Sequence, residues 1–287
     1  MAFSVMRREP GSVLVPDRFY DVAISEAGLS DTVDVYVFGY PSTKLGRDAE
    51  ASFTIREAGR ALEAELKRHR VAETYTRIVF VGHSMGGLVT LQALLNDPAL
   101  RSKVPLVVSY GTPYQGAQIA AIGRLVFPNP GLDVLRSIEK NDNEYLAALN
   151  DQWRRLKEAP SAPKVRCAYE KKTIAPLDQL IVPEASGTAL CDGAASAIEE
   201  DHLGMVKPTS AQHRSVTVFV NAYREDALNF VAGAVPVAKT ASQSMLPSLA
   251  PLPCVASAAG PGSAGTAKAG AGGVAIVASG CAQVNVK

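Results

Sequence analysis

The stretch at residues 77–87 reads RIVFVGHSMGG, and the interpretation of the whole chain starts from it. Its first five residues have the character of a buried strand, and Ser84 follows them between Gly82 and Gly86. The next run, LVTLQALL at 88–95, carries a helix-like apolar pattern and stops before Pro98. Only glycine fits easily beside such a tight strand-to-helix turn, which lifts the serine hydroxyl above the sheet edge. The stretch therefore predicts a nucleophile elbow with Ser84 at its tip.

Strand and helix patterns alternate on both sides of this turn. Such alternation predicts an α/β fold, with a mostly parallel sheet covered by helices on both faces, in one domain at residues 1–232. Strands are predicted at 33–38, 77–81, 104–110 and 165–169 and ending near Glu200, and helices at 17–28, 49–70 and 88–95 and between Gln212 and Val231.

Two further segments lie outside this alternation. Residues 116–163 are mainly helical in pattern and are interrupted at 128–131 by PNPG, so we expect a helical insertion there, a candidate cap over the site. Beyond Gly233 the composition shifts to Ala, Gly, Pro and Ser, and aromatic residues vanish. Small, interrupted apolar residues do not build a core, so residues 233–287 are predicted to form a disordered tail.

Composition excludes several classes of protein. The chain has 287 residues, 47% of them apolar and 20% charged, and a formal net charge of +1, so no basic face for nucleic acid or an anionic membrane is expected. No run reaches the ~18 apolar residues that a membrane span needs, and no signal peptide is visible. The four cysteines lack C-x-x-C or metal-ligand spacing, so free thiols, no metal and a cytoplasmic location are predicted. These cysteines are Cys167, Cys191, Cys254 and Cys281.

A serine hydroxyl becomes nucleophilic at neutral pH only when an imidazole takes its proton and a carboxylate orients that imidazole. In folds with this elbow the acid and the histidine follow the serine, which leaves His202 and His213 as candidate bases. His202 lies in a polar turn after the last predicted strand and is preferred, since His213 is expected to open the final helix.

Two carboxylates are candidates for the acid. Glu170 directly ends the strand predicted at 165–169, and Asp178 lies in a loop beyond it. Glu170 is preferred, and Asp178 stays open as the alternative acid. Asp201 is a weaker third choice because it is adjacent to the histidine and is expected to point away.

Five motifs follow one another along the chain: FGYPS at 38–42, VGHSMGGLV at 81–89, GTPYQGA at 111–117, YE at 169–170 and DHLGMVKP at 201–208. Together they resemble those of lipase-like α/β-hydrolases of the serine-active-site-containing protein group and, more distantly, of the GPI inositol-deacylases. The resemblance implies the α/β-hydrolase fold and hydrolysis of carboxylic esters, including lipid-like ones, without a cofactor. It matches Ser84 with the nucleophile and His202 with the base.

One expected element of this group is not evident. The oxyanion hole takes one backbone N–H from the residue after the nucleophile, here Met85, and a second from a loop that usually carries His-Gly. The residues ahead of Val33 contain no His-Gly pair. One oxyanion donor contributes about 2.7–4 kcal/mol, so we expect weak activity or a reading frame that begins upstream. The favoured function is a serine esterase, and the alternative is a non-catalytic module that binds a lipid or protein partner.

Overall fold

The computed structural model describes residues 4–8, 19–29, 33–40, 54–117, 144–175, 178–230 and 274–281. Among them, strands form one seven-stranded sheet in the order β1-β2-β7-β3-β4-β5-β6. β1 pairs antiparallel with β2, and every other pairing is parallel. The strands are β1 (Ser4–Arg8), β2 (Val33–Tyr40), β3 (Arg77–His83), β4 (Leu106–Tyr110), β5 (Lys164–Glu170), β6 (Ser196–Ile198) and β7 (Val274–Cys281).

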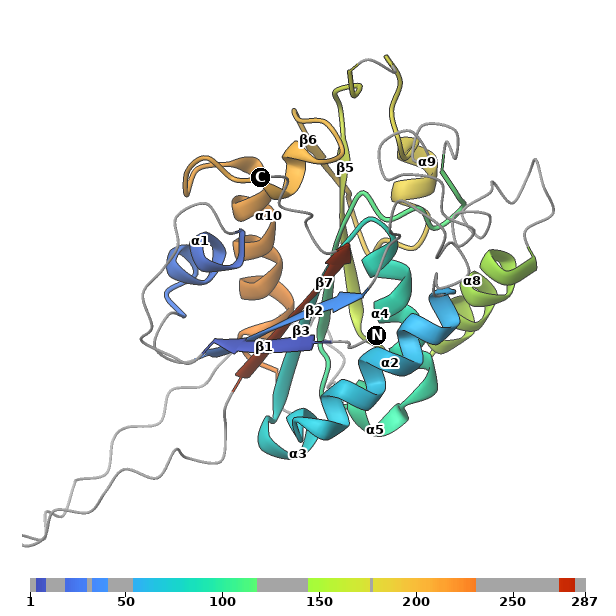
Figure 1. Cartoon of the computed structure of the whole chain (residues 1–287), viewed down its shortest axis with the longest axis vertical. Helices are drawn as coiled ribbons and strands as arrows, with labels where there is room; N and C mark the ends of the chain where they lie inside the picture. Colours follow the sequence, from blue (N-terminus) through green and yellow to red (C-terminus); the bar gives the residue numbers. More distant parts are fainter. Residues whose placement is uncertain are drawn as a thin grey trace, which may run out of the picture.

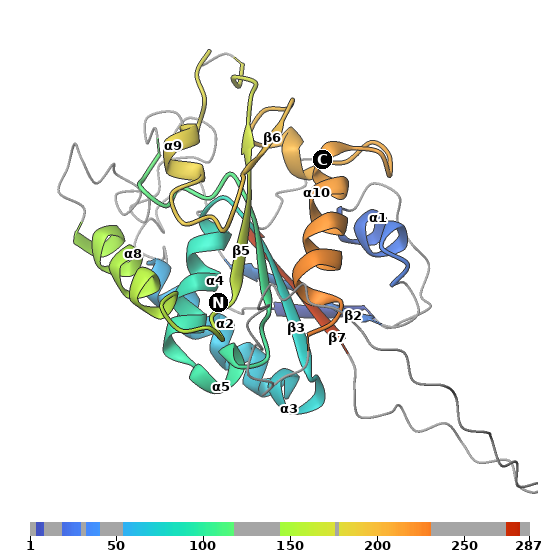
Figure 2. The ribbon, with the colours of Figure 1, turned by 180° about the vertical axis from the view of Figure 1, so that it is seen from behind.

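Helices cover both faces of the sheet, as the alternating pattern predicts. α1 and α10 lie on one face, while α2, α4 and α8 lie on the other (Figures 1 and 2). The helices of the described ranges are α1 (Phe19–Glu26), α2 (Ile55–Arg68), α3 (Val71–Thr74), α4 (Met85–Asn96), α5 (Pro98–Arg101), α8 (Glu144–Leu156), α9 (Glu184–Gly187), α10 (Arg214–Ala222), the 3-10 turn η3 (Gly204–Val206) and the π turn η4 (Tyr223–Ala227).

The central strand β3 shows why the core has two halves. Successive side chains of a strand point to opposite faces, so Ile78 and Phe80 join the apolar cluster under α2 and α4. Val79 and Val81 join the cluster under α1 and α10. Both faces of β3 are therefore buried, which explains the continuous apolar run in the sequence.

α8 belongs to the insertion predicted at 116–163. Its residues Leu146, Leu149 and Trp153 are buried against the helical layer beside α4. A helix with one apolar stripe packs in this way on a neighbouring helix. Residues 118–143, which complete the candidate cap, lie outside the described residues.

β7 differs from the expected tail. Val274–Cys281 pairs with β2 on one side and with β3 on the other, in the middle of the sheet. Val277 is buried in the core, 1% exposed. The segment VAIVASGC is short and apolar, as is typical of an interior strand of a parallel sheet, but its Ala, Gly and Ser neighbours in the sequence made it resemble the rest of the tail. The rest of the predicted tail, residues 233–273 and 282–287, lies outside the described residues.

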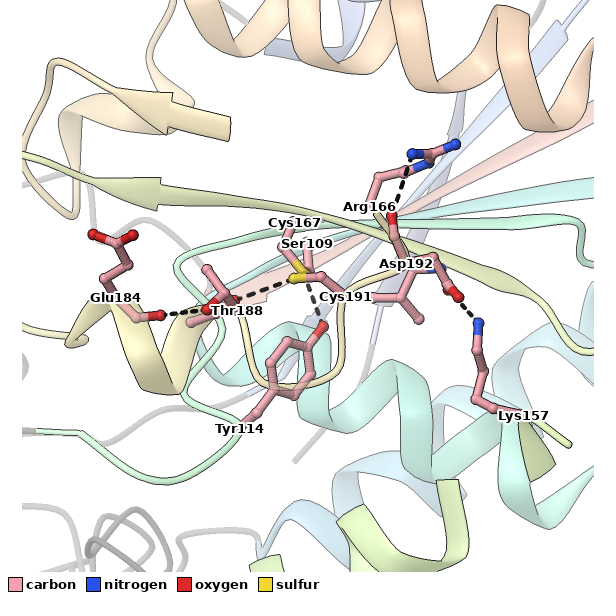
Figure 3. The surroundings of a disulfide bond; sticks show 11 residues. Ser109, Tyr114, Lys157, Arg166, Cys167, Glu184, Thr188, Cys191 and Asp192 are labelled. Atoms are coloured by element: carbon pink, nitrogen blue, oxygen red, sulfur yellow. Dashed lines mark hydrogen bonds and ion pairs between the residues drawn. A yellow bond between two sulfur atoms is a disulfide. The ribbon is translucent and has the colours of Figure 1, made fainter. Parts of the chain in front are cut away.

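Two of the thiols expected to be free are paired. Cys167 of β5 and Cys191, which follows α9, form a disulfide (Figure 3). The residues are 24 positions apart without a recognisable motif, and only the return of the α9 loop onto β5 brings their Cα atoms to 5.7 Å. Disulfides persist mainly in oxidising compartments, so this pair removes one observation on which the predicted cytoplasmic location depended.

Among the described helices, none combines the length and the hydropathy that crossing a bilayer requires.

Candidate active site

The turn between β3 and α4 has the sharp geometry predicted for residues 82–87. Ser84 takes φ 53° and ψ −132°, a conformation that residues with a Cβ rarely adopt. A Cβ on Gly82 would lie 2.7 Å from the Cα of Gly87, and a Cβ on Gly87 would overlap the side chain of Thr112. The turn can therefore close only because both positions are glycine.

The Ser84 hydroxyl is directed at an imidazole. Ser84 is the N-cap residue of α4, where a serine usually accepts a hydrogen bond from its own helix, yet its side chain makes no such bond. Instead its Oγ lies 3.0 Å from Nε2 of His202. Folding thus keeps the hydroxyl available for chemistry rather than for capping.

His202 connects the serine to a carboxylate. Its Nδ1 lies 2.8 Å from Oε2 of Glu170, and both side chains are buried. A carboxylate accepts hydrogen bonds, so Nδ1 carries the ring proton and donates a hydrogen bond to Glu170. Nε2 is then the unprotonated nitrogen and can accept the Ser84 hydroxyl proton. The structure brings together the three residues that the sequence singled out first.

The second oxygen of Glu170 is held by the backbone. Oε1 accepts hydrogen bonds from the amides of Ile181 and Val182, each at 2.8 Å. These two donors were not predicted, because a backbone amide has no side-chain signature. Their effect is to fix the carboxylate in the orientation that His202 requires.

The loop that carries His202 is fixed from two sides. Asp201 Oδ1 accepts from the amides of Leu203 at 2.9 Å and Gly204 at 2.7 Å, so Asp201 does point away from the imidazole as expected. His83 Nε2 donates to the backbone carbonyl of His202 at 2.8 Å. Burial, with the neighbouring His202 and Lys207 adding to it, lowers the pKa of His83 to about 3. His83 is therefore neutral near pH 7.

Gly111, directly after β4, lets the imidazole and the carboxylate approach the backbone. Its φ is +54°, and a Cβ would lie 3.0 Å from His202 Nδ1 and 3.1 Å from Glu170 Oε2. Any side chain would crowd the hydrogen bond between these two groups. In the sequence this glycine was noted only as the first residue of the motif GTPYQGA at 111–117, with no role of its own.

The remaining candidates lie elsewhere. Asp178 has no hydrogen bond to His202 in the described structure, and its Oδ1 lies 3.4 Å from Thr173 Oγ1. His213 is the N-cap of α10, and its Nδ1 accepts from the amide of Ser215 at 3.3 Å, as expected for a residue that opens the final helix. Met85 is the first residue of α4, where a backbone amide has no acceptor within the helix.

A polar cavity of about 180 Å³ lies between α2, α4 and α8. Its lining includes Gln92 and Asn96, at the opposite end of α4 from Ser84, so it is separate from the serine. Within the described ranges, no three His, Cys, Asp or Glu side chains gather as the ligands of a metal ion would.

The sheet order, the elbow and the hydrogen bond between Glu170, at the end of β5, and His202, after β6, define an α/β-hydrolase fold. The model of the alpha/beta hydrolase family matches residues 10–237. The chain belongs to this family, and it is a hydrolase by fold. A search of curated proteins gave no match.

Several solved structures are similar to this chain at low sequence identity. The mature lipase BlEst2 of Bacillus licheniformis is 15% identical, with a TM-score of 0.44, covering 71% of this chain and 93% of the lipase. The lin2722 product of Listeria innocua is 16% identical, with a TM-score of 0.44 and coverage of 79% and 94%. The meta-cleavage product hydrolase CumD is 12% identical, with a TM-score of 0.46 and coverage of 78% and 94%.

Proposed function

We propose that this chain is a serine hydrolase that acts on carboxylic esters through Ser84, His202 and Glu170. The observation that carries the proposal is the continuous set of hydrogen bonds from Glu170 through His202 to Ser84. A nucleophile, a base and an orienting carboxylate in this order are the arrangement that acyl transfer requires.

In the first half of the proposed reaction, Ser84 Oγ attacks the ester carbonyl carbon while its proton moves to His202 Nε2. The carbonyl oxygen becomes an oxyanion, which the Met85 amide at the N-terminus of α4 is positioned to stabilise. The tetrahedral intermediate collapses, the bond to the alcohol breaks, and His202 returns its proton to the leaving oxygen. Ser84 then carries the acyl group.

Water completes the cycle. His202 Nε2 takes a proton from a water molecule, whose oxygen attacks the acyl carbon, and the second tetrahedral intermediate releases the carboxylic acid. The proton returns to Ser84 Oγ. Glu170 stays ionised throughout and stabilises the charged imidazole that forms in each half, held by the amides of Ile181 and Val182.

Active-site labelling and ester turnover test the proposal. We expect a fluorophosphonate probe to label Ser84 and p-nitrophenyl esters of graded chain length to be hydrolysed, with long chains preferred if the substrate is lipid-like. Ser84→Ala should abolish both signals. Glu170→Gln should lower kcat by about 10³–10⁴, because the amide no longer secures the required tautomer of the imidazole. Asp178→Asn, the matched control at the alternative acid, should stay within about threefold of the parent.

The opposite result would support the alternative of a non-catalytic module. This result would be a folded chain that is not labelled by the probe and hydrolyses no ester. If the parent and the Ser84→Ala variant also bound phospholipid vesicles equally well, the chain would be a binding module and not an enzyme. The Glu170–His202–Ser84 hydrogen bonds favour the enzyme, since binding alone has no need of them.

A further inference from the structure

The strands on the two sides of β3 contribute different groups to the site around Ser84. Glu170 ends β5, His202 follows β6 and Gly111 follows β4, and these strands all lie on one side of β3. The base and the acid therefore occupy that side. A carbonyl attacked by Ser84 presents its oxygen away from the imidazole, toward the Met85 amide and whatever backbone lies on the other flank.

The strand on that other flank is β7, which comes from the far end of the sequence (Figures 1 and 2). It runs parallel to β3, so both strands end at the same edge of the sheet. Ser279 is opposite Gly82, and Cys281 is two residues beyond Ser279 just as Ser84 is two residues beyond Gly82. Cys281 and Ser84 therefore both lie just beyond the last pair of β7 and β3, at the same edge of the sheet.

The position of β7 is fixed along its length. All eight residues are paired with β2, from Val33 opposite Val274 to Tyr40 opposite Cys281. Its first six residues are also paired with β3, from Arg77 opposite Val274 to Gly82 opposite Ser279. Val277 is buried in the core cluster that contains Phe80. A strand held on both edges and packed through its middle positions its last residues with little freedom.

We propose that the backbone N–H of Cys281, at the end of β7, is the second oxyanion donor of the site. The C-terminal strand then completes a catalytic centre whose other parts lie between Ser84 and His202, and it supplies the donor that the residues ahead of Val33 do not provide through a His-Gly loop. This inference rests on the proposed esterase function. In the reaction, the Cys281 and Met85 amides together bind the oxyanion of each tetrahedral intermediate.

A pair of variants tests the donor. Cys281→Pro removes the backbone N–H, and Cys281→Ala, the reference, keeps it. We expect kcat for a p-nitrophenyl ester to be about 10²–10³ lower in the proline variant than in the alanine variant, with a much smaller difference in KM. Equal values within about threefold would overturn the inference.

Folding and function are separated by three further measurements. If Cys281→Pro does not fold, lactic acid introduced at position 281 removes only the N–H, and its kcat is compared with that of Cys281→Ala. Hydrogen exchange on the full chain should protect the amides of 275–279 as strongly as those of 78–82, whereas the Cys281 amide, which has to be free for the oxyanion, should exchange faster. Rapid exchange throughout 275–279 would refute the strand. Absence of labelling and turnover in the parent would refute the esterase itself, whereas an active parent with equal Cys281 variants refutes only the donor.

Discussion

Ser84 has a backbone conformation that only the surrounding structure can hold. A non-glycine residue at φ 53° and ψ −132° costs on the order of 1–3 kcal/mol. The Ser84 amide donates to the carbonyl of Tyr110 at 2.9 Å, and its carbonyl accepts from Gly87 at 3.1 Å. These hydrogen bonds hold the strained turn in place. The resulting backbone conformation directs the hydroxyl at His202 rather than at its own helix.

Substitutions at position 84 should separate activity from stability. Ser84→Ala and Ser84→Gly both lose the nucleophile, and ester turnover should fall at least about a thousandfold in each. Glycine relieves the positive-φ strain, partly offset by its greater chain entropy when unfolded, so Ser84→Gly should be more stable than Ser84→Ala by about 1 kcal/mol. Urea unfolding of the two variants measures the difference. Equal stabilities would contradict the strained turn.

His83 should make stability fall in mild acid. The ordinary histidine pKa is 6.5, and burial lowers the pKa of His83 to about 3 in the folded protein. Between these values the unfolded chain binds a proton at His83 that the folded chain does not, so stability decreases as pH falls. At pH 5 this contribution is roughly 2 kcal/mol.

The substitution His83→Gln tests this contribution, because glutamine can still donate to the carbonyl of His202 but does not titrate. The free energy of unfolding of the variant, relative to the parent, should rise by up to about 2 kcal/mol between pH 7.5 and pH 5. A constant difference over this pH range would mean that His83 titrates normally in the folded state.

The connection between β5 and β6 is an element that holds the acid in place. Cys167 of β5 and Cys191 are joined by the disulfide, and Glu170, Ile181 and Val182 all lie between them in the sequence. Asp192, next to Cys191, attaches the same loop to β5 a second time, because its carboxylate accepts a hydrogen bond from the Val165 amide at 2.7 Å. The same carboxylate pairs with Lys157 (Figure 3). The orientation of Glu170 therefore depends on how this returning loop is attached to β5.

Opening the disulfide should loosen this element. Cys191→Ser removes a link across 24 residues, for which chain entropy gives a loss of roughly 3 kcal/mol. Because the amides of Ile181 and Val182 would hold Glu170 less firmly, kcat should fall more than KM rises. Denaturant unfolding and ester kinetics measure both effects. The parent treated with reducing agent should match the variant, and the variant should not respond to reduction.

At the scale of the whole molecule, the sheet brings together strands that are far apart in the sequence. β7 separates β2 from β3 and pairs with both, so a segment about 190 positions from β3 lies at the centre of the fold. Such a long-range pairing has a large loop-closure entropy, which burial of residues such as Val277 must offset.

Val277→Ala should therefore destabilise the entire domain. Removing the two methyl groups of a side chain that is 1% exposed costs about 1–3 kcal/mol through lost burial and a new cavity. Leu228→Ala, at a position 46% exposed, is the control and should stay within about 0.5 kcal/mol of the parent. Thermal unfolding should show one transition that shifts for Val277→Ala. An unchanged transition would indicate that β7 is not part of the core.

Much of the sheet could be predicted because its signals are local. The apolar runs at 33–38, 77–81 and 165–169 lie within β2, β3 and β5. The glycines at 82 and 86, on either side of Ser84, predict the elbow because steric exclusion acts between near neighbours. The preference for Glu170 agrees with the observed contact because a residue at the end of a parallel strand reaches the functional edge. Asp178 stayed open as the alternative acid because the sequence does not show which loop carboxylate returns to the histidine; in the structure the hydrogen bond to His202 is made by Glu170.

The sequence by itself determined the order of strands and helices around Ser84 and the glycine-flanked turn, because these depend on periodicity and on steric limits between adjacent residues. The order of residues along the chain also indicated His202 as the histidine that contacts Ser84. The tertiary structure alone decided the Cys167–Cys191 pairing, the two amides that hold Glu170 and the central position of β7. Each of these joins groups far apart in the chain, and the free energy that selects such contacts comes from burial and hydrogen bonding in the assembled fold, which no local pattern encodes.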